Sequence, residues 1–146
     1  MSTAYESATL LIRLYELRRE PMMREARTWF VSKFHATSID ELMQVLSGPN
    51  SAHFRMVASY WEMAASFVNH GAIDEQLFNE TNGEHVAVYA KVEPFLADLR
   101  ELTKTPDLLS NLEKLVSRIP EANEKTAGFR ERAKAKQSAR QTAAAA

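Results

Sequence analysis

The stretch from Asn50 to Gly71, NSAHFRMVASYWEMAASFVNHG, decides the fold because its spacing predicts one helix with two apolar faces. At about 100° per residue, two separate lines of apolar side chains run along this helix. They are Phe54, Ala58, Trp61, Ala65 and Val68, and then Met56, Tyr60, Met63 and Phe67. A surface helix has only one such face. We therefore expect a central helix, from about residue 51 to 70, that the rest of the chain encloses on nearly all sides.

A narrow polar strip separates the two apolar faces of this helix. Its members are Arg55, Ser59, Glu62, Ser66 and Asn69. Such a strip either faces water or lines a small polar groove, in which Arg55 would hold an anion and Glu62 would act as an acid or base. Both alternatives stay open, and the candidate ligand-binding residues are Arg55, Ser59, Glu62 and Ser66.

The remaining chain up to residue 119 also has the apolar periodicity of helices. Further helices are predicted at residues 3–19, 21–35, 38–47, 74–81, 84–104 and 106–119. Asn50 or Ser51 can cap the start of the central helix, and Gly71 can end it in a left-handed conformation. Pro94 should bend or split the helix that contains it. The fold class is therefore all-α, a single-domain helical bundle of six or seven helices around the central helix.

The composition changes after Pro120. Between Glu121 and Ala146 the only large apolar residue is Phe129, and six basic residues face three acidic ones. Such a segment cannot bury enough apolar surface to fold alone. We expect residues 1–119 to form the helical domain and residues 120–146 to form a solvated helix as far as about Lys134, followed by a frayed, basic and alanine-rich tail.

The residue inventory argues against most kinds of catalytic site. The chain has no cysteine and four scattered glycines, which excludes thiolate chemistry and glycine-rich phosphate loops. None of the four histidines has a glutamate three residues before it, so the paired motif of helical di-iron sites is absent. We expect the histidines to lie at the surface or to cap helix ends. No catalytic residue, metal or cofactor is predicted.

The first two helices carry apolar residues on more than one face, and this favours an interaction function. On the first helix, Tyr5, Ala8, Leu11 or Ile12, and Tyr15 form one line. The candidate interface residues are Leu10, Leu14, Leu17, Met22 and Trp29. If a monomer leaves them uncovered, they would form the seam of a homodimer or bind a protein partner. The alternative is that this hairpin closes over the central helix. A non-enzymatic interaction or regulatory module is the favoured function.

Nucleic acid and membrane are the disfavoured partners. The basic tail could follow phosphates, but it has no stacking aromatic residues among its charges, and the formal net charge of the chain is -1. Weak nucleic-acid binding through this tail is the last alternative. The apolar cluster from Leu10 to Leu14 is interrupted by Arg13, so neither a signal peptide nor a membrane span is expected. We expect a cytoplasmic protein.

Two neighbouring segments carry a family resemblance. The segment YWEMAASFV, residues 60–68, followed by GAIDEQL, residues 71–77, resembles a bacterial family of small, uncharacterised helical proteins, a domain of unknown function. The resemblance extends over about residues 43–102. It implies an all-helical fold and no established activity, and it carries over no catalytic residue.

Overall fold

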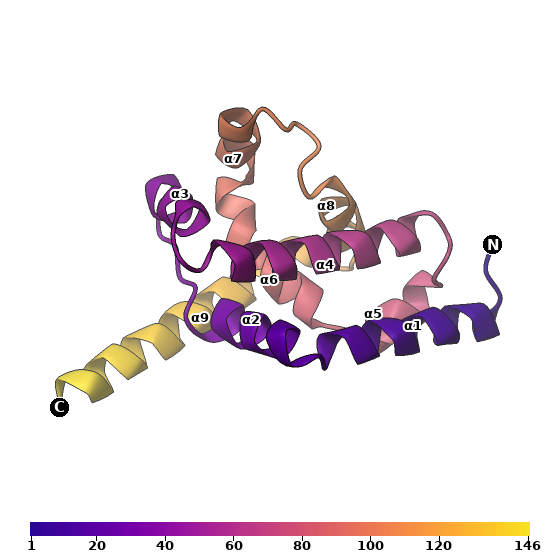
Figure 1. The fold of residues 1–146 in the computed structure, drawn as a ribbon, viewed down its shortest axis with the longest axis horizontal. Coiled ribbons are helices and arrows are strands. Elements are labelled where there is room, and N and C mark those ends of the chain that lie inside the picture. Colours follow the sequence, from indigo (N-terminus) through magenta and orange to yellow (C-terminus); the bar gives the residue numbers. More distant parts are fainter.

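The computed structural model describes residues 1–146 and is built from helices, without strands (Figure 1). The helices are α1 (Ala4–Arg18), α2 (Pro21–Ser32), α3 (Ile39–Ser47), α4 (Ser51–Asn69), α5 (Glu75–Thr81), α6 (Glu84–Val92), the 3-10 helix η1 (Glu93–Phe95), α7 (Leu96–Thr103), α8 (Ser110–Ser117) and α9 (Ala122–Ala145). The all-α prediction is confirmed. The number of helical segments exceeds the six or seven expected, partly because the predicted helix 84–104 is split.

Helix α4 is the centre of the fold. It contacts α2, α3, α5, α6 and α8, and its residues join one continuous apolar core. Trp61 is 1% exposed, and Phe54 packs against Phe30 of α2 with their ring centroids 5.6 Å apart. Tyr60 on the second apolar line is also buried, whereas Met63 on the same line is 38% exposed. The predicted central helix is therefore confirmed. Met63 lies where the enclosing helices leave α4 partly exposed to solvent.

The ends of α4 show where the cap predictions hold. Gly71 has φ 76°, the left-handed conformation that glycine adopts without strain. At the other end Asn50 occupies the N-cap position, but its side chain makes no capping hydrogen bond. A second prediction, that a helix starts at Pro106, is wrong, because the chain forms turns there and α8 begins only at Ser110.

Pro94 splits the predicted long helix into three segments. Its ring removes one backbone donor and clashes with the preceding turn, so the chain passes from α6 through η1 into α7. The change of direction makes α7 stand up beside α3, with α4 below both (Figure 1). This arrangement forms the walls of the groove described below.

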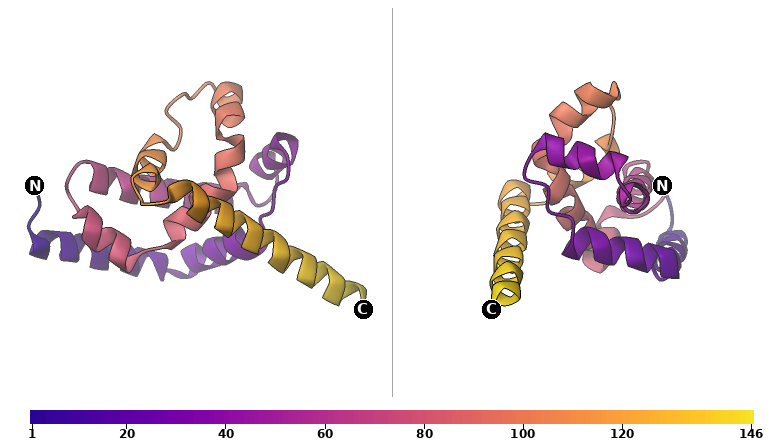
Figure 2. Two further views of the ribbon diagram at one scale, coloured as in Figure 1. Left: turned by 180° about the vertical axis from the view of Figure 1, so that it is seen from behind. Right: turned by 60° about the vertical axis from the view of Figure 1, so that its left-hand side comes forward.

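Helix α9 is the longest helix and lies outside this assembly for much of its length (Figure 2). It contacts α6 and α8, and Thr126 is its only buried residue. The helix continues to Ala145, beyond the end expected near Lys134. The division into residues 1–119 and 120–146 stays a prediction. No helix combines the length and the apolarity that crossing a membrane requires.

Candidate functional site

A groove of about 640 Å³ lies between α3, α4, α7 and the loop that precedes α8. Seven of its 12 lining residues are apolar, namely Met43, Leu46, Phe54, Ala58, Leu99, Leu108 and Leu109. The polar lining residues are Ser47, Arg55, Ser59, Glu62 and Thr103. The groove is therefore mainly apolar, and only two of its side chains carry charge.

Three of the four candidate ligand-binding residues line this groove. Arg55, Ser59 and Glu62 do so because they lie on the side of α4 that faces the space between α3 and α7. Ser66 lies outside the groove, and its hydroxyl donates to the Met63 carbonyl of the same helix. The first part of the polar strip therefore borders a cavity, and its later part does not.

Arg55 supplies a positive charge that no side chain of the protein neutralises. The residue is exposed at the groove, and its guanidinium takes part in none of the ion pairs of the chain. Its five N–H donors are free to bind an anion. The rim of the groove thus combines a free cation with an apolar wall.

Glu62 differs from Arg55, because both of its carboxylate oxygens accept hydrogen bonds from the start of α8. Oε1 accepts from the backbone N–H and the side-chain Nδ2 of Asn111, both at 3.0 Å, and Oε2 accepts from the Leu112 N–H at 2.8 Å. The first residues of α8 receive no cap from their own segment. A carboxylate there satisfies free N–H groups and complements the positive end of the helix. We therefore assign Glu62 a capping role rather than an acid–base role.

The loop that closes one wall of the groove is bounded by two strained residues. Lys104 and Leu109 have φ 54° and 57°, in the left-handed region that costs a non-glycine residue about 1–2 kcal/mol. Leu109 is 5% exposed, so its burial in the core offsets this cost. Strained backbone of this kind is concentrated at binding sites. Lys104 ends α7 in this conformation, and Leu109 precedes α8 in it.

His85 is the residue for which the histidine prediction is wrong. It is 1% exposed, packs against Trp61 and Phe78 with ring centroids 5.7 Å and 5.0 Å away, and neither ring nitrogen has a hydrogen-bond partner. Burial lowers the pKa of His85 to about 4. His85 therefore belongs to the core. No group of three or more His, Asp or Glu side chains is arranged to hold a metal ion.

The candidate interface residues divide between the core and the surface. Leu14 and Trp29 are 6% and 9% exposed, and the Tyr60 hydroxyl donates to the Leu14 carbonyl at 2.6 Å. Leu10 is half-buried against the core. Leu17 and Met22 are 53% and 55% exposed. The hairpin thus closes over α4 through Leu14 and Trp29, and these two residues cannot also form a seam with another molecule.

The comparisons with known proteins identify a family without an assigned activity. The family model of a domain of unknown function, DUF4760, matches residues 3–119, which include α1 to α8 and end before α9. This match confirms the resemblance to an uncharacterised family and extends it beyond residues 43–102. The comparison with curated proteins and the comparison with solved structures each gave no match.

Proposed function

The chain belongs to the DUF4760 family, a domain of unknown function, and on this premise we propose that it is a non-enzymatic binding module for a small amphiphile. The ligand has an apolar body, which lies between α3, α4 and α7, and an anionic group, which pairs with Arg55. The observation that carries this proposal is the unpaired arginine at the rim of a mainly apolar groove.

The size and lining of the groove support an apolar ligand. Its volume of about 640 Å³ falls in the range of small-molecule sites, roughly 300–1,000 Å³. The apolar lining offers burial to a hydrocarbon chain, at about 0.8 kcal/mol for each buried CH₂ group. This gain in binding free energy favours a ligand with several methylene groups.

The charges at the groove favour an anion as the second part of the ligand. Both oxygens of Glu62 accept hydrogen bonds from α8, so Arg55 is the charged side chain of the groove whose hydrogen-bonding groups are free to contact a ligand. A guanidinium binds a carboxylate or a phosphate through two parallel N–H donors. An amine-bearing ligand would meet repulsion from the same group.

The hydroxyl groups of the groove favour binding over catalysis. Ser47, Ser59 and Thr103 each donate to a backbone carbonyl of their own helix. None of them contacts a basic side chain that could activate it as a nucleophile. A cytoplasmic location for this module stays a prediction from the sequence.

Calorimetric titration with three probes of equal chain length tests the proposal. Octanoate should bind more tightly than octanol, and octylamine should bind most weakly. In Arg55→Gln the preference for octanoate over octanol should disappear while octanol binding stays. If octanoate and octanol bind the native protein equally, the proposed role of Arg55 is wrong.

A pair of tryptophan substitutions on α4 locates the binding. Ser59→Trp places a large side chain at the groove and should abolish binding of octanoate and octanol. Ala52→Trp makes the same kind of change at an exposed position of α4 outside the groove and should leave both unchanged. Equal effects of the two variants, or no binding of any probe at millimolar concentration, would contradict the proposal.

A second candidate function is self-association through the outer face of α1. Tyr5, Ile12 and Tyr15 are 81%, 59% and 51% exposed. Tyr5 and Ile12 lie opposite the buried residues Ser7 and Leu14 of the same helix, and Tyr15 lies beside them. Exposed apolar residues gathered on one face commonly mark an interface. The occupant that we propose is a second copy of the chain, with Leu17 and Met22 at the edge of the contact.

Sedimentation velocity at micromolar concentration tests this second candidate. The native chain should sediment as a dimer, and Ile12→Asp should sediment as a monomer with unchanged helical circular dichroism. Val31→Asp, at an exposed apolar position on α2, is the control and should leave the dimer intact. A native chain that is monomeric over the whole concentration range would exclude the dimer without bearing on the groove.

A further inference from the structure

The groove between α3, α4 and α7 has two ends that differ in charge. Arg55 and Glu62 are its only charged lining residues, and they lie seven positions apart on α4. At about 100° and about 1.5 Å per residue, they share one face of the helix and are separated by about 10.5 Å along its axis. The groove therefore places a cation and a carboxylate two helical turns apart.

The neighbouring segments identify these two ends. Arg55 lies on the second turn of α4, which follows α3 after a short turn. Glu62 contacts Asn111 in the first turn of α8, and the groove residue Leu109 directly precedes α8. A ligand that pairs with Arg55 and extends along α4 therefore points its far end towards Glu62.

Glu62 keeps its negative charge at this far end. Its hydrogen-bond donors are two backbone N–H groups and the side-chain amide of Asn111, all of which are neutral, and Glu62 forms no ion pair. The positive end of α8 offsets only about half an elementary charge. The three hydrogen bonds also hold the half-buried carboxylate in place, where charges interact more strongly than in bulk water.

No side chain of opposite sign lines the groove beside Glu62. Arg100 of α7 pairs with Glu113 and donates to the Leu108 carbonyl, so its guanidinium is engaged. The loop after α7 carries Lys104 and Asp107, one charge of each sign, and neither lines the groove. An anionic group placed beside Glu62 would therefore meet repulsion without a compensating partner.

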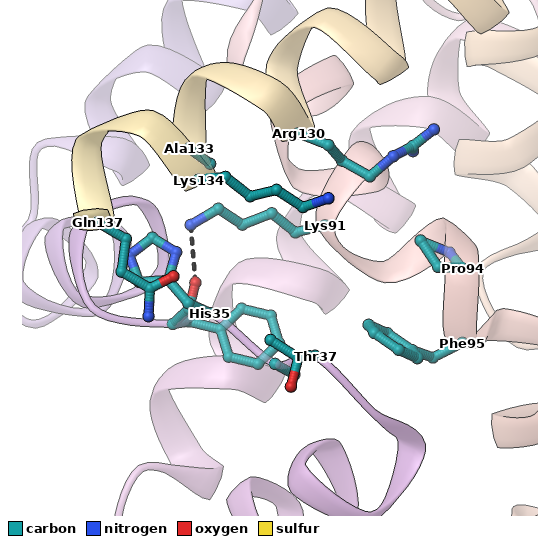
Figure 3. Close-up of a pocket in the computed structure, with 11 residues that line it drawn as sticks. His35, Thr37, Lys91, Pro94, Phe95, Arg130, Ala133, Lys134 and Gln137 are labelled. Atoms are coloured by element: carbon teal, nitrogen blue, oxygen red, sulfur yellow. Dashed lines mark hydrogen bonds between the residues drawn. The ribbon is translucent and has the colours of Figure 1, made fainter. Parts of the chain in front are cut away.

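A second cavity, of about 480 Å³ beside α9, contains more basic residues but offers no free buried cation (Figure 3). The Lys91 ammonium donates to three backbone carbonyls at the end of α2, and Arg130 donates to Glu93 at 2.8 Å. The other basic residues are His35, whose pKa is lowered by burial, and Lys134, which is largely exposed. The groove is therefore the better site for an anionic ligand.

We propose that Glu62 determines the specificity of the groove by rejecting ligands that are anionic at both ends. This inference rests on the proposed function, because it requires the contact between Arg55 and an anionic group. The ligand class is then the aliphatic monocarboxylates with an uncharged far end, and dicarboxylates of the same length are excluded. Like charges that repel the wrong ligand are a common source of specificity.

Calorimetric titration with three acids of equal chain length tests this proposal. Octanoate carries one carboxylate, suberate carries a second one at its far end, and monomethyl suberate has that second group masked as an ester. Octanoate and monomethyl suberate should bind the native protein, and suberate should bind about tenfold more weakly than monomethyl suberate. The ester separates the effect of charge from that of size. Equal binding of suberate and monomethyl suberate would overturn the proposal.

A charge-removing variant and its control assign the rejection to one residue. Glu62→Gln removes the charge and keeps an amide oxygen that can accept from α8, so the affinities for suberate and monomethyl suberate should become nearly equal. Glu101→Gln, at an exposed position of α7 outside the groove, removes an equal charge and should keep the native difference. The same change in both variants would reduce the effect to the net charge of the protein and overturn the proposal.

Amide NMR spectra test the direction of the bound chain. Octanoate should shift the resonances of Asn111 and Leu112, because its far end reaches Glu62, whereas the shorter butanoate should leave them in place. Shifts of equal size with both acids would contradict this direction. If neither octanoate nor octanol binds the native protein, the proposed function fails as well; if both bind and suberate is not rejected, only the role of Glu62 fails.

Discussion

The two longest helices of the molecule, α4 and α9, are held in place by different forces. Helix α4 has 19 residues, and eight of them are buried. Helix α9 has 24 residues, and one of them is buried. The first therefore depends on apolar burial, which the second almost entirely lacks.

Directed polar contacts take the place of burial along α9. Arg130 pairs with Glu93 of η1, and Arg140 donates to the Ser32 carbonyl at the end of α2 at 2.6 Å. Phe129 is the one large apolar side chain that packs partly against the core. Alanine, lysine, arginine and glutamine make α9 a good helix by intrinsic propensity, whereas α4 obtains most of its stability from its neighbours. A residue of this chain can therefore be helical without belonging to the core.

The largest effect on stability is expected at Trp61 of α4, and it can be compared with the effect at Phe129 of α9. Trp61→Ala in α4 should lower the free energy of unfolding by about 3–5 kcal/mol, because it removes a fully buried aromatic side chain and leaves a cavity. Phe129→Ala in α9 should lower it by about 1 kcal/mol. Urea denaturation followed by circular dichroism measures both values. Equal losses would show that α9 is as much a part of the core as α4.

Acid should lower the free energy of unfolding through His85, which lies on the side of α6 that faces α4. His85 has a pKa of about 4 in the folded protein, against 6.5 when unfolded. The unfolded state therefore binds more protons between these values, so the stabilising contribution is complete above pH 6.5 and is lost as the pH falls towards 4. The loss amounts to about 3 kcal/mol. Denaturation midpoints measured between pH 7 and pH 4 should show this decline, and it should be much smaller in His85→Leu.

Glu62 tests whether α4 also stabilises the fold through a polar contact. Glu62→Ala should cost about 2 kcal/mol, and Glu62→Gln about 1 kcal/mol because an amide oxygen can still accept one bond. Amide hydrogen exchange of Asn111 and Leu112 should accelerate in both variants. Glu101→Ala, at an exposed position of α7, should leave stability unchanged. Unaltered exchange at Asn111 would remove the capping role.

The smallest effect concerns the far end of α9. Arg140→Gln should change the overall stability by less than about 0.5 kcal/mol, because the residue is exposed and its contact is local. Hydrogen exchange beyond Lys136 should nevertheless become faster, since the last anchor of the helix is removed. Exchange that stays slow would show that helix propensity alone keeps this end ordered.

The architecture was predictable because its signals are local. The apolar lines of α4, the left-handed Gly71 and the split at Pro94 each depend on residues close together in sequence. The capping hydrogen bonds of Ser38 and Asp74 are also local. Periodicity and caps of this kind are readable without a structure.

The features that escaped prediction depend on residues far apart in sequence. Glu62 and the start of α8 are 49 residues apart, so the polar strip could not reveal its partner. The sequence Thr105-Pro106 is typical of a helix start. In the structure, however, Leu109 is buried in the core in a left-handed conformation, and α8 begins only at Ser110. The burial of His85 likewise follows from tertiary packing, and the same packing decides the burial of Leu14 and Trp29, which the sequence left open between two alternatives. Three of the four candidate ligand-binding residues line the groove, whereas its apolar walls come from separate segments of the chain and could not be predicted.

The hydrogen bonds between Glu62 and the α8 N-terminus also join two helices that are synthesised at different times. During synthesis the carboxylate leaves the ribosome before the amides that it binds, so the acceptor is present when its donors emerge. Until α8 reaches α4, the N–H groups of its first turn can bond to water, and the carboxylate replaces that water when the two helices meet. A circular permutant that places α8 ahead of α4 should still form this contact, because the contact depends on where the two helices meet and not on their order along the chain.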